Sequence, residues 1–549
     1  MTSGTIIETP VLIVGAGPIG LCMAMELGWR GIECTIIDKG DGSIDLPRGA
    51  MVSARTMEFC RRWGIADHVP LAGFPQDYAL NMVYCTSLTG YLLERDDFPA
   101  EQDRSPPPTS PERRVWCPQL QFDPMMARAV AELPNVAMRY HHELLSFADG
   151  PDHIDALCRL PDGSEVTFRA RYMVGCDGAA SFIREAADIP LDGRSLGYSV
   201  NIFFRSPTLL SRHDKGPAER YLFLDETGTW GNITVVNGKD EWRLTVMAGQ
   251  DRVDMAQFDA EGYVRKAMGR DDIPFELIAV KPWRRSEYNA RHFRKGRVLL
   301  AGDAAHTMSP TGGFGMNTGV IDVANLGWKL QAVLQGWGAD ALLDSYEIEQ
   351  KPVVRRNAEA STTNFHLWTG VRELCGPVLE DTPEGAEARC KVGALLKESL
   401  REEWECLGIQ LGYRYEDSPI CLPDGTPETP DEVSVYQPTA RPGSRAPHAW
   451  LSNGFSILDL FGKTFVLLRF GEADTGALVD AAVSRGIPLE VVTIQDDAIA
   501  ALYERALVLV RPDGHVAWRA DSVPDDPGAV LDRVRGAAGV AHQPVAAAA

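Results

Sequence analysis

Short apolar runs that end in a glycine-containing turn recur along the first two thirds of the chain. Three segments have this form, 10–14, 172–174 and 298–301, and residues 32–37 give a further predicted strand that ends in Asp38. Runs of this length without polar alternation are typical of parallel strands buried between helices. Helix formers with few breakers follow at 21–29, and apolar residues at helical spacing follow at 320–330, with Asp322 expected in the first turn of the second helix. The pattern predicts an α/β fold.

Two other segments have the character of half-buried strands. Residues 78–93 and 200–246 are rich in aromatic and β-branched side chains and predict a mainly antiparallel sheet. Two sets of residues share a strand face at a spacing of two: Trp230, Asn232 and Thr234, and Tyr221 with Phe223. Such a face could line a flat aromatic pocket, although strands also contain these residue types for packing alone.

The remaining third divides into a helical part, a linker and a further α/β pattern. Residues 341–400 read as largely helical, and six prolines between 423 and 447 mark a linker. Beyond it the pattern predicts one helix at 476–485 and strands at 456–460, 464–470, 489–494, 507–510 and 516–519.

Composition narrows the function classes. The 549 residues are 45% hydrophobic, enough for a large core, and the formal net charge of −22 argues against nucleic acid or an anionic membrane as partner. The chain has no run of 18 apolar residues and residues 1–10 lack a signal pattern, so a cytoplasmic location is expected. The eleven cysteines show no C-x-x-C spacing, so neither a metal site nor a dithiol redox motif is expected.

A complete dinucleotide fingerprint follows the first predicted strand. Residues 15–20 read GAGPIG, and Asp38 ends the next strand 18 residues later. In this context Gly15 allows the tight turn, Gly17 the approach of a pyrophosphate and Gly20 close packing of helix on strand, while Asp38 meets ribose hydroxyls.

Two more strands deliver an acidic residue to the same sheet edge. Asp177 follows the strand at 172–174, and Asp303 follows the strand at 298–301, ahead of a loop that contains Gly312, Gly313 and Gly315. A strand, an acid, a glycine-rich loop and a helix amino terminus together indicate a site for a large polar ligand that carries negative charge. Because only one three-glycine fingerprint is present, two dedicated dinucleotide domains are not expected.

Three motifs in this order resemble those of the single-component (group A) FAD-dependent aromatic hydroxylases: GAGPIG at 15–20, YMVGCDGAASFIR at 172–184 and RVLLAGDAAHTMSPTGGFGMNTG at 297–319. The segment at 46–50, the glutamine segment at 117–124 and YEIEQKP at 346–352 also resemble segments of that family. The resemblance implies that FAD is held by Gly15, Gly17, Pro18, Gly20, Asp38, Lys39, Arg48, Gln119, Asp177, Gly302, Asp303, Pro310, Gly312, Gly313, Gly315, Met316 and Asn317. A surface salt bridge remains the alternative for Arg48, and a structural role the alternative for Gln119.

The resemblance also implies the domain organisation. A FAD-binding Rossmann-like domain of the glutathione-reductase type is expected at 1–76, 117–199 and 281–400, with an inserted β substrate domain at 77–116 and 200–280. A linker at 401–440 and a thioredoxin-like domain at 441–540 follow. The latter segment contains no cysteine, which excludes disulfide exchange and leaves packing or formation of a homodimer.

The resemblance further implies an NAD(P)H- and oxygen-dependent monooxygenase that acts through a flavin C4a-hydroperoxide on a small phenol or catechol. The residues expected to line the substrate pocket are Tyr221, Phe223, Trp230, Asn232, Thr234 and Pro310. Candidates for orienting or deprotonating the phenol are His213, Tyr221 and His306, although His306 is also interpretable as a structural loop residue. An already acidic phenol would need less help from a base.

Within the family, the nitrocatechol hydroxylases provide the leading interpretation, with release of the nitro group as nitrite. Three alternatives remain at this point. One is a hydroxylase of a larger polycyclic intermediate of the rebeccamycin type. The others are an FAD dehydrogenase or oxidase that does not use NAD(P)H, and a protein in which FAD is structural.

Overall fold

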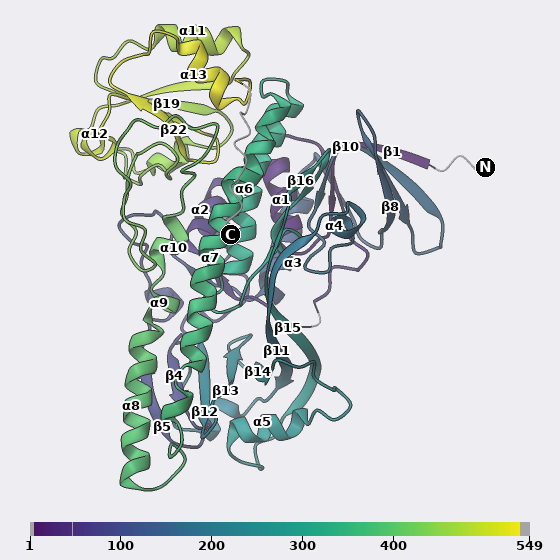
Figure 1. Cartoon of the computed structure of the whole chain (residues 1–549), viewed down its shortest axis with the longest axis vertical. Coiled ribbons are helices and arrows are strands. Elements are labelled where there is room, and N and C mark those ends of the chain that lie inside the picture. The colour runs from purple at the N-terminus through teal and green to yellow at the C-terminus, as the bar shows by residue number, and fades with distance from the viewer. Residues whose placement is uncertain (1–4, 45, 47, 539–549) are drawn as a thin grey trace.

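The computed structural model describes residues 5–44, 46 and 48–538. Figure 1 shows a central sheet around β1 and β10, a second sheet with α5 below it, and a small domain of α11 to α13 above it. The long helices α6 and α7 run between these parts. No helix of the described residues is long and apolar enough to cross a membrane.

The central sheet has the strand order β16-β17-β10-β1-β2-β7 in the described chain. Strands β7, β2, β1, β10 and β17 pair in parallel, so their carboxyl ends meet at one edge. The bounds are Thr5–Val14 (β1), Cys34–Ile37 (β2), Val136–Arg139 (β7), Glu165–Gly175 (β10), Arg294–Lys295 (β16) and Val298–Leu300 (β17). A hairpin of Glu143–Asp149 (β8) and Ile154–Arg159 (β9) extends β10.

The helices that cover this sheet pack closely on one another where glycines leave no side chain between them. A Cβ atom on Gly319 of α6 would lie 2.6 Å from Ile19 of α1, and one on Gly327 would lie 2.4 Å from Glu26. These contacts bring α6 onto α1 at the fingerprint end of the sheet. The helices are Pro18–Trp29 (α1), Ala54–Arg62 (α2), Gln119–Ala131 (α3), Phe182–Ala186 (α4), Phe314–Leu334 (α6) and Asp344–Thr369 (α7).

The second sheet has the order β18-β15-β11-β14-β13-β12-β4-β5 and is antiparallel except where β12 meets β4. Its bounds are Met82–Cys85 (β4), Leu92–Asp96 (β5), Leu191–Arg205 (β11), Arg220–Asp225 (β12), Gly228–Val235 (β13), Glu241–Gly249 (β14), Glu276–Ala290 (β15) and His306–Thr307 (β18). One face packs on Ala260–Met268 (α5), and the other packs on α7 and Pro383–Ser399 (α8). A small sheet of Met51–Val52 (β3) and Val115–Trp116 (β6) lies between the domains.

Two long strands join the sheets. Both β11 and β15 have 15 residues, and Leu191 of β11 pairs with Ala290 of β15. Asn289 of β15 then pairs with His306 of β18, in the loop that follows the central strand β17. The second sheet is therefore fixed directly to the loop that bears Asp303.

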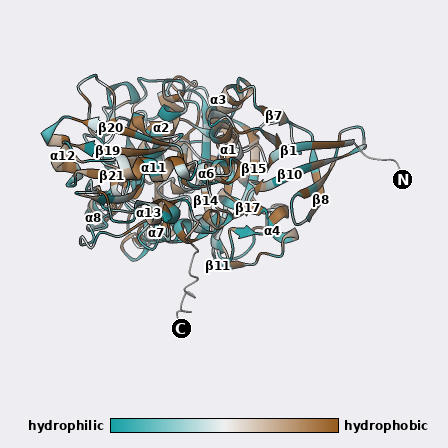
Figure 2. Ribbon diagram, turned by 90° about the horizontal axis from the view of Figure 1, so that it is seen from above, coloured by the Kyte–Doolittle hydropathy of each residue, from teal (hydrophilic) through white to brown (hydrophobic). Residues whose placement is uncertain are grey.

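The C-terminal domain has a four-stranded sheet in the order β20-β19-β21-β22, in which β19 and β20 are parallel and the other pairs antiparallel. Its bounds are Phe465–Phe470 (β19), Leu489–Ile494 (β20), Leu507–Val510 (β21), Val516–Ala520 (β22), Gly476–Ser484 (α11), Asp497–Tyr503 (α12) and Pro527–Val534 (α13). Figure 2 shows hydrophobic residues gathered on β19 and β21, the centre of this sheet.

One predicted strand of this domain is wrong. The segment at 456–460 forms a 3-10 turn, Ile457–Leu460, because Ser456 and Asp459 make a reciprocal capping box that satisfies the first N–H groups of a helix. Residues 539 and 540 of the expected domain lie outside the described residues.

The segment at 401–440, expected to be a linker, packs between the domains. It contains Arg401–Trp404 (α9) and Leu407–Leu411 (α10), and Tyr413 and Tyr415 are buried beside the C-terminal domain. The overall architecture is the predicted α/β fold with an inserted β-sheet and a C-terminal domain of mixed topology.

Candidate functional site

The fingerprint glycines have separable roles. Gly15 has φ 104°, and a Cβ on it would lie 2.5 Å from the carbonyl oxygen of Cys176, while one on Gly20 would lie 1.8 Å from that of Gly15. Gly17, by contrast, has no atom within 4 Å of such a Cβ. Gly15 and Gly20 are thus required by the protein's own backbone, and Gly17 faces open space at the start of α1, where a pyrophosphate fits.

Asp38 ties the fingerprint turn to the end of β2. One carboxylate oxygen accepts the N–H of Ala16 at 2.7 Å, and the other accepts the N–H of Gly40 at 2.7 Å. The carboxylate remains half-buried, and Lys39 beside it is exposed. Asp38 is therefore held at the cleft edge by two backbone groups of its own chain.

Asp177 shapes the turn after β10. Its carboxylate accepts the hydroxyl of Ser181 at 2.5 Å and the N–H of Ile183 at 3.1 Å, at the start of α4. The motif that resembles the family's Asp-Gly segment thus caps a short helix at the same sheet edge as the fingerprint.

Asp303 stands out in the Gly-Asp motif because its neighbours are buried and it is exposed. Desolvation by the surrounding protein raises the pKa of its carboxyl group, while nearby His306 and Arg48 oppose the shift. Gly302 before it has φ 60° and packs on Ile19 of α1. A solvent-accessible carboxylate next to a glycine that packs on α1 fits the hydroxyl groups of a ribityl chain.

A buried ion pair holds this turn. Asp322 accepts the N–H of Gly302 at 2.9 Å and lies 2.7 Å from Nε2 of His306. Because α6 begins at Phe314, Asp322 lies two turns into the helix, so the expectation of a first-turn residue is corrected. Burial would lower the pKa of His306, but Asp322 outweighs it and the pKa is raised. His306 is engaged as a positioning residue, which corrects its candidacy as the substrate's base.

The amino terminus of α6 is also engaged by the protein. The N–H of Gly312, expected beside the cofactor, donates to Glu403 at 3.1 Å. The side chain of Asn317 accepts the N–H of Ser53 at 2.8 Å and donates to the carbonyl of Met51 at 3.0 Å. The N–H of Gly312 and the side chain of Asn317 therefore position the loop. Of the other residues expected to contact the cofactor here, Pro310 is exposed, and Gly313, Gly315 and Met316 are half-buried.

Arg48 lies in an exposed loop that crosses from the cofactor side to the second sheet; Pro47 before it is outside the described residues. Its N–H donates to Gln119 at 3.3 Å, and its carbonyl accepts from Arg243 at 3.0 Å. Gln119 in turn donates to Asp123, a carboxyl whose pKa burial raises to about 7. The salt-bridge alternative for Arg48 finds no support in the described part of the chain.

The aromatic residues expected to line the substrate pocket lie on the face of the second sheet that packs on α5, which corrects that expectation. Tyr221, Phe223 and Trp230 belong to the core that packs on α5. A bulge between Phe223 and Leu224, opposite Trp230, breaks the spacing of two and turns Trp230 toward α5, where it stacks on Phe223 at 5.3 Å.

His213 lies with these aromatic residues. Its ring meets Tyr221 edge-on at 5.4 Å, and the Tyr221 hydroxyl donates to the carbonyl of Gly216. Burial lowers the pKa of His213 to about 4. Tyr221 is therefore a core residue behind the sheet and His213 a half-buried residue beside it, which corrects the candidacy of both as the substrate's base.

Asn232 and Thr234 occupy the opposite face, and the Thr234 hydroxyl donates to Asn232 at 3.2 Å. Thr234 pairs with Arg220 on one side and with Arg243 on the other, so a polar row crosses three strands. Since Arg243 bonds to Arg48, this face looks toward the cofactor side.

Sequence reasoning missed Glu403, which lies in the supposed linker. Its buried carboxylate accepts from Gly312, from Arg220 at 2.9 Å and from the indole of Trp368 at 2.6 Å. It thus joins the α6 loop, the second sheet and α7. No spacing in the sequence signals this contact, because its partners are far apart along the chain.

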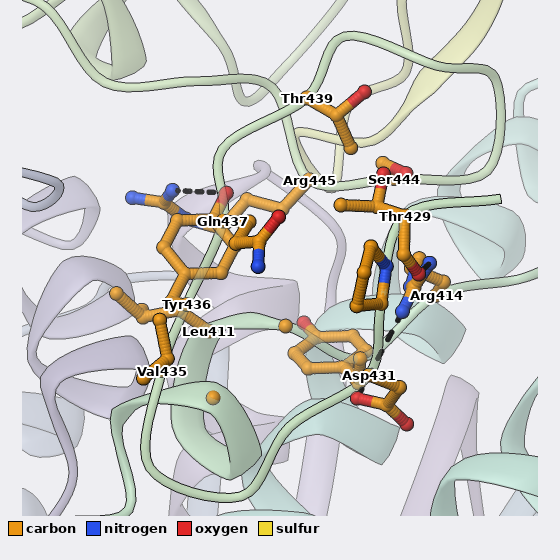
Figure 3. A pocket seen from close by; sticks show the side chains of 14 residues that line it. Leu411, Arg414, Thr429, Asp431, Val435, Tyr436, Gln437, Thr439, Ser444 and Arg445 are labelled. Atoms are coloured by element: carbon orange, nitrogen blue, oxygen red, sulfur yellow. Dashed lines mark hydrogen bonds and ion pairs between the residues drawn. The ribbon is translucent and has the colours of Figure 1, made fainter. Parts of the chain in front are cut away.

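A cavity within the 408–445 segment is too small to hold a cofactor. Figure 3 shows a space lined by residues of the 408–445 segment, with Arg445 bonded to Tyr436 and Arg414 paired with Asp431. Its volume of 10 Å³ is about that of one water. Among the described residues, no group of three or more histidine, cysteine or acidic side chains could hold a metal.

Two family models match this chain. A family model described as FAD binding domain matches residues 8–361, and one described as Aromatic-ring hydroxylase, C-terminal, matches residues 439–538.

Relatives match along nearly the whole chain. The tetracenomycin B2 monooxygenase-dioxygenase of Streptomyces olivaceus is 33% identical over 96% of this chain and 98% of its own. The 4-methyl-5-nitrocatechol 5-monooxygenase of Burkholderia sp. is 32% identical over 96% of each chain. The structure of the rebeccamycin biosynthetic enzyme RebC with reduced flavin is 39% identical, with a TM-score of 0.90 over 97% of this chain and 100% of that one.

Proposed function

We propose, because the chain belongs to the family of FAD-binding aromatic-ring hydroxylases, that it inserts one oxygen atom into a phenolic ring with NAD(P)H as electron donor. The observation that carries the proposal is the carboxyl edge of the central sheet, where Gly17 can accept a close ligand and Asp303 is exposed. FAD, when bound, supplies the hydride acceptor and the oxygen-activating group.

The protein's own residues would bind and orient that cofactor. Gly17 and the start of α1 would take the pyrophosphate, and Asp303 the ribityl hydroxyls. The His306–Asp322 pair would keep Asp303 in place through Gly302. The second sheet, α7 and α9 would exclude water from the reacting ring.

For the substrate, we propose a small acidic phenol of the nitrocatechol type. The three candidate bases are engaged elsewhere: His213 and Tyr221 lie behind the sheet, and His306 pairs with Asp322. A phenol that is already ionised at neutral pH does not require such a base. A nitrocatechol has this property, and the Burkholderia relative is named for such a substrate.

The proposed reaction balances as follows. One atom of O2 enters the ring and the other becomes water, while NAD(P)H supplies two electrons. The nitro group leaves as nitrite and the ring becomes a hydroxyquinone.

A larger polycyclic phenol is the second candidate. It is favoured by the similarity to RebC, named as a rebeccamycin biosynthetic enzyme, and to the enzyme named for tetracenomycin B2.

The test is a panel of catechol, 4-nitrocatechol, 4-methyl-5-nitrocatechol and a polycyclic phenol, offered to the holoenzyme with NADH or NADPH. We expect the nitrocatechols to stimulate NAD(P)H oxidation most strongly, with nitrite formed in proportion. Flavin that is reduced by substrate without NAD(P)H would instead identify a dehydrogenase or oxidase.

A further inference from the structure

The loop in front of α6 contains two adjacent glycines with little conformational restriction of their own. Gly312 and Gly313 both have a positive φ, 86° and 66°, and glycine restricts its backbone less than any other residue. The residue before them is fixed, because the hydroxyl of Thr311 donates to the carbonyl of Ser361 on α7 at 2.5 Å. Beyond Thr311, the direction in which the chain enters α6 is therefore set by the contacts of these glycines.

Glu403 of α9 provides such a contact. Its carboxylate accepts the N–H of Gly312 at 3.1 Å from a position 91 residues further along the chain. The N-cap residue of α6, Gly313, has no side chain that could accept. Glu403 is only 1% exposed, so water does not compete for the contact. The acceptor at the amino end of α6 is thus supplied by a separate segment.

The same segment, residues 401–412 and called the strap below, holds a second helix. Gln410 of α10 accepts the N–H of Ala54 at the start of α2 at 2.9 Å. The preceding residue, Ser53, donates its N–H to Asn317 of α6 at 2.8 Å. Figure 1 shows α9 and α10 beside α7, between α8 and the C-terminal domain. The strap thus contacts the amino ends of two helices that are also bonded to each other.

The helix end that these contacts fix has free donors. Within the described part of the chain, the N–H groups of Phe314, Gly315 and Met316 have no acceptor. The first N–H groups of a helix lack partners within the helix and favour a ligand that carries negative charge. Their direction follows from the path of the chain through Gly312 and Gly313.

Glu403 brings no uncompensated negative charge to this end of α6. Arg220 of β12 pairs with it at 2.9 Å, and the indole N–H of Trp368 donates to its other oxygen at 2.6 Å. The oxygen that pairs with Arg220 is also the one that accepts from Gly312. The side chain can therefore hold the loop without repelling an anionic ligand.

We propose, resting on the FAD site of the function proposed above, that Glu403 is a positioning residue for the cofactor. By holding the N–H of Gly312, it directs the free donors at the amino end of α6 toward FAD. The strap that carries Glu403 is then part of the cofactor site as well as a connection between domains.

The test compares substitutions at the two ends of the Arg220–Glu403 pair. Glu403→Met and Arg220→Met each leave one buried group without its partner, so both should lower the unfolding midpoint. Only Glu403→Met removes the acceptor of Gly312, because a buried carboxyl group that loses Arg220 takes up a proton and still accepts through its carbonyl oxygen. Release of FAD from the diluted holoenzyme, followed by flavin fluorescence, gives the affinity. We expect Glu403→Met to weaken FAD binding about tenfold or more and Arg220→Met less than about threefold.

Two further variants keep the test informative if a single substitution unfolds the protein. Arg220→Met/Glu403→Met removes both charges, so its unfolding midpoint should return toward that of the wild type while FAD stays weakly bound. Glu403→Gln, which keeps one side-chain oxygen, should recover part of the FAD affinity lost in Glu403→Met. Glu402→Gln is the matched control, because Glu402 is adjacent but exposed, and it should bind FAD as the wild type does.

The outcomes also separate this inference from the proposed function. Equal weakening of FAD binding by Glu403→Met and Arg220→Met, or wild-type affinity in the double variant, would assign Glu403 to the ion pair alone and overturn the proposal. These measurements use neither a phenol nor NAD(P)H. Variants that bind FAD as expected, in a protein that oxidises no phenol, would remove the hydroxylase proposal and leave the role of Glu403 standing.

Discussion

At the scale of single residues, the most informative position is Gly17, because it can accept a side chain without strain. Its φ is −74°, and a Cβ would meet no atom of the protein within 4 Å. Gly17→Ala should therefore leave apoprotein stability within about 0.5 kcal/mol of the wild type. The same methyl group should obstruct the pyrophosphate and weaken FAD binding about tenfold or more, as measured by flavin fluorescence.

Gly376→Ala provides the matched control for this prediction. Gly376 also has no atom within 4 Å of an added Cβ, and it lies in the loop before α8, remote from the cleft. Wild-type FAD affinity in Gly17→Ala would show that the pyrophosphate does not lie against this turn.

At the scale of elements, the two faces of the second sheet should respond differently to conservative substitution. Tyr221→Phe removes a buried hydroxyl that bonds to Gly216, so stability should fall by about 1 kcal/mol while KM and kcat stay unchanged. Thr234→Val, on the opposite face, should change the KM for the aromatic substrate with little change in the unfolding midpoint. If Tyr221→Phe lost turnover while Thr234→Val kept the wild-type KM, the substrate would lie on the face that packs on α5, contrary to the assignment made here.

This contrast shows what local patterning could predict. The strand-turn-helix context and the acids at strand ends predicted that Gly17, Asp177 and Asp303 follow neighbouring parallel strands, because these features depend on residues close along the chain. The facing of Trp230 could not be predicted, because a bulge depends on the register with β12. Glu403 was missed because its environment is assembled from segments up to 183 residues apart along the chain.

At the scale of the whole molecule, buried ion pairs hold the C-terminal domain on the cofactor domain. Glu349 of α7 accepts from Arg511 at 2.5 Å and from Lys329 of α6 at 2.6 Å. Burial disfavours its ionised form, but Arg511 and Lys329 outweigh this and lower its pKa from 4.5 to about 2. We infer that the cysteine-free domain serves packing through such contacts.

Replacing this carboxylate should loosen that attachment. Glu349→Gln leaves Arg511 and Lys329 without their shared partner, so we expect a loss of about 3–5 kcal/mol in unfolding free energy. The folded pKa is depressed, so the loss should be full above pH 4.5 and shrink as pH falls toward about 2, where the wild-type carboxylate is itself protonated. Thermal unfolding of the wild type and of Glu349→Gln between about pH 2 and pH 7 measures this difference in unfolding free energy.

The control for this prediction is Glu347→Gln, two residues earlier on α7. Glu347 is partly exposed and pairs with Lys351 at 2.6 Å, so its replacement should cost about 0–1 kcal/mol. Equal effects of the two substitutions would contradict a special role for the buried pair.

The measurement that tests the central claim most directly is the origin of the oxygen in the product. The holoenzyme is supplied with NAD(P)H, a nitrocatechol and ¹⁸O2, and the quinone is reduced at the quench to prevent exchange with water. A monooxygenase places one ¹⁸O atom in each ring product, with one NAD(P)H consumed per nitrite released. Product without ¹⁸O, or oxygen recovered entirely as hydrogen peroxide, would contradict the account.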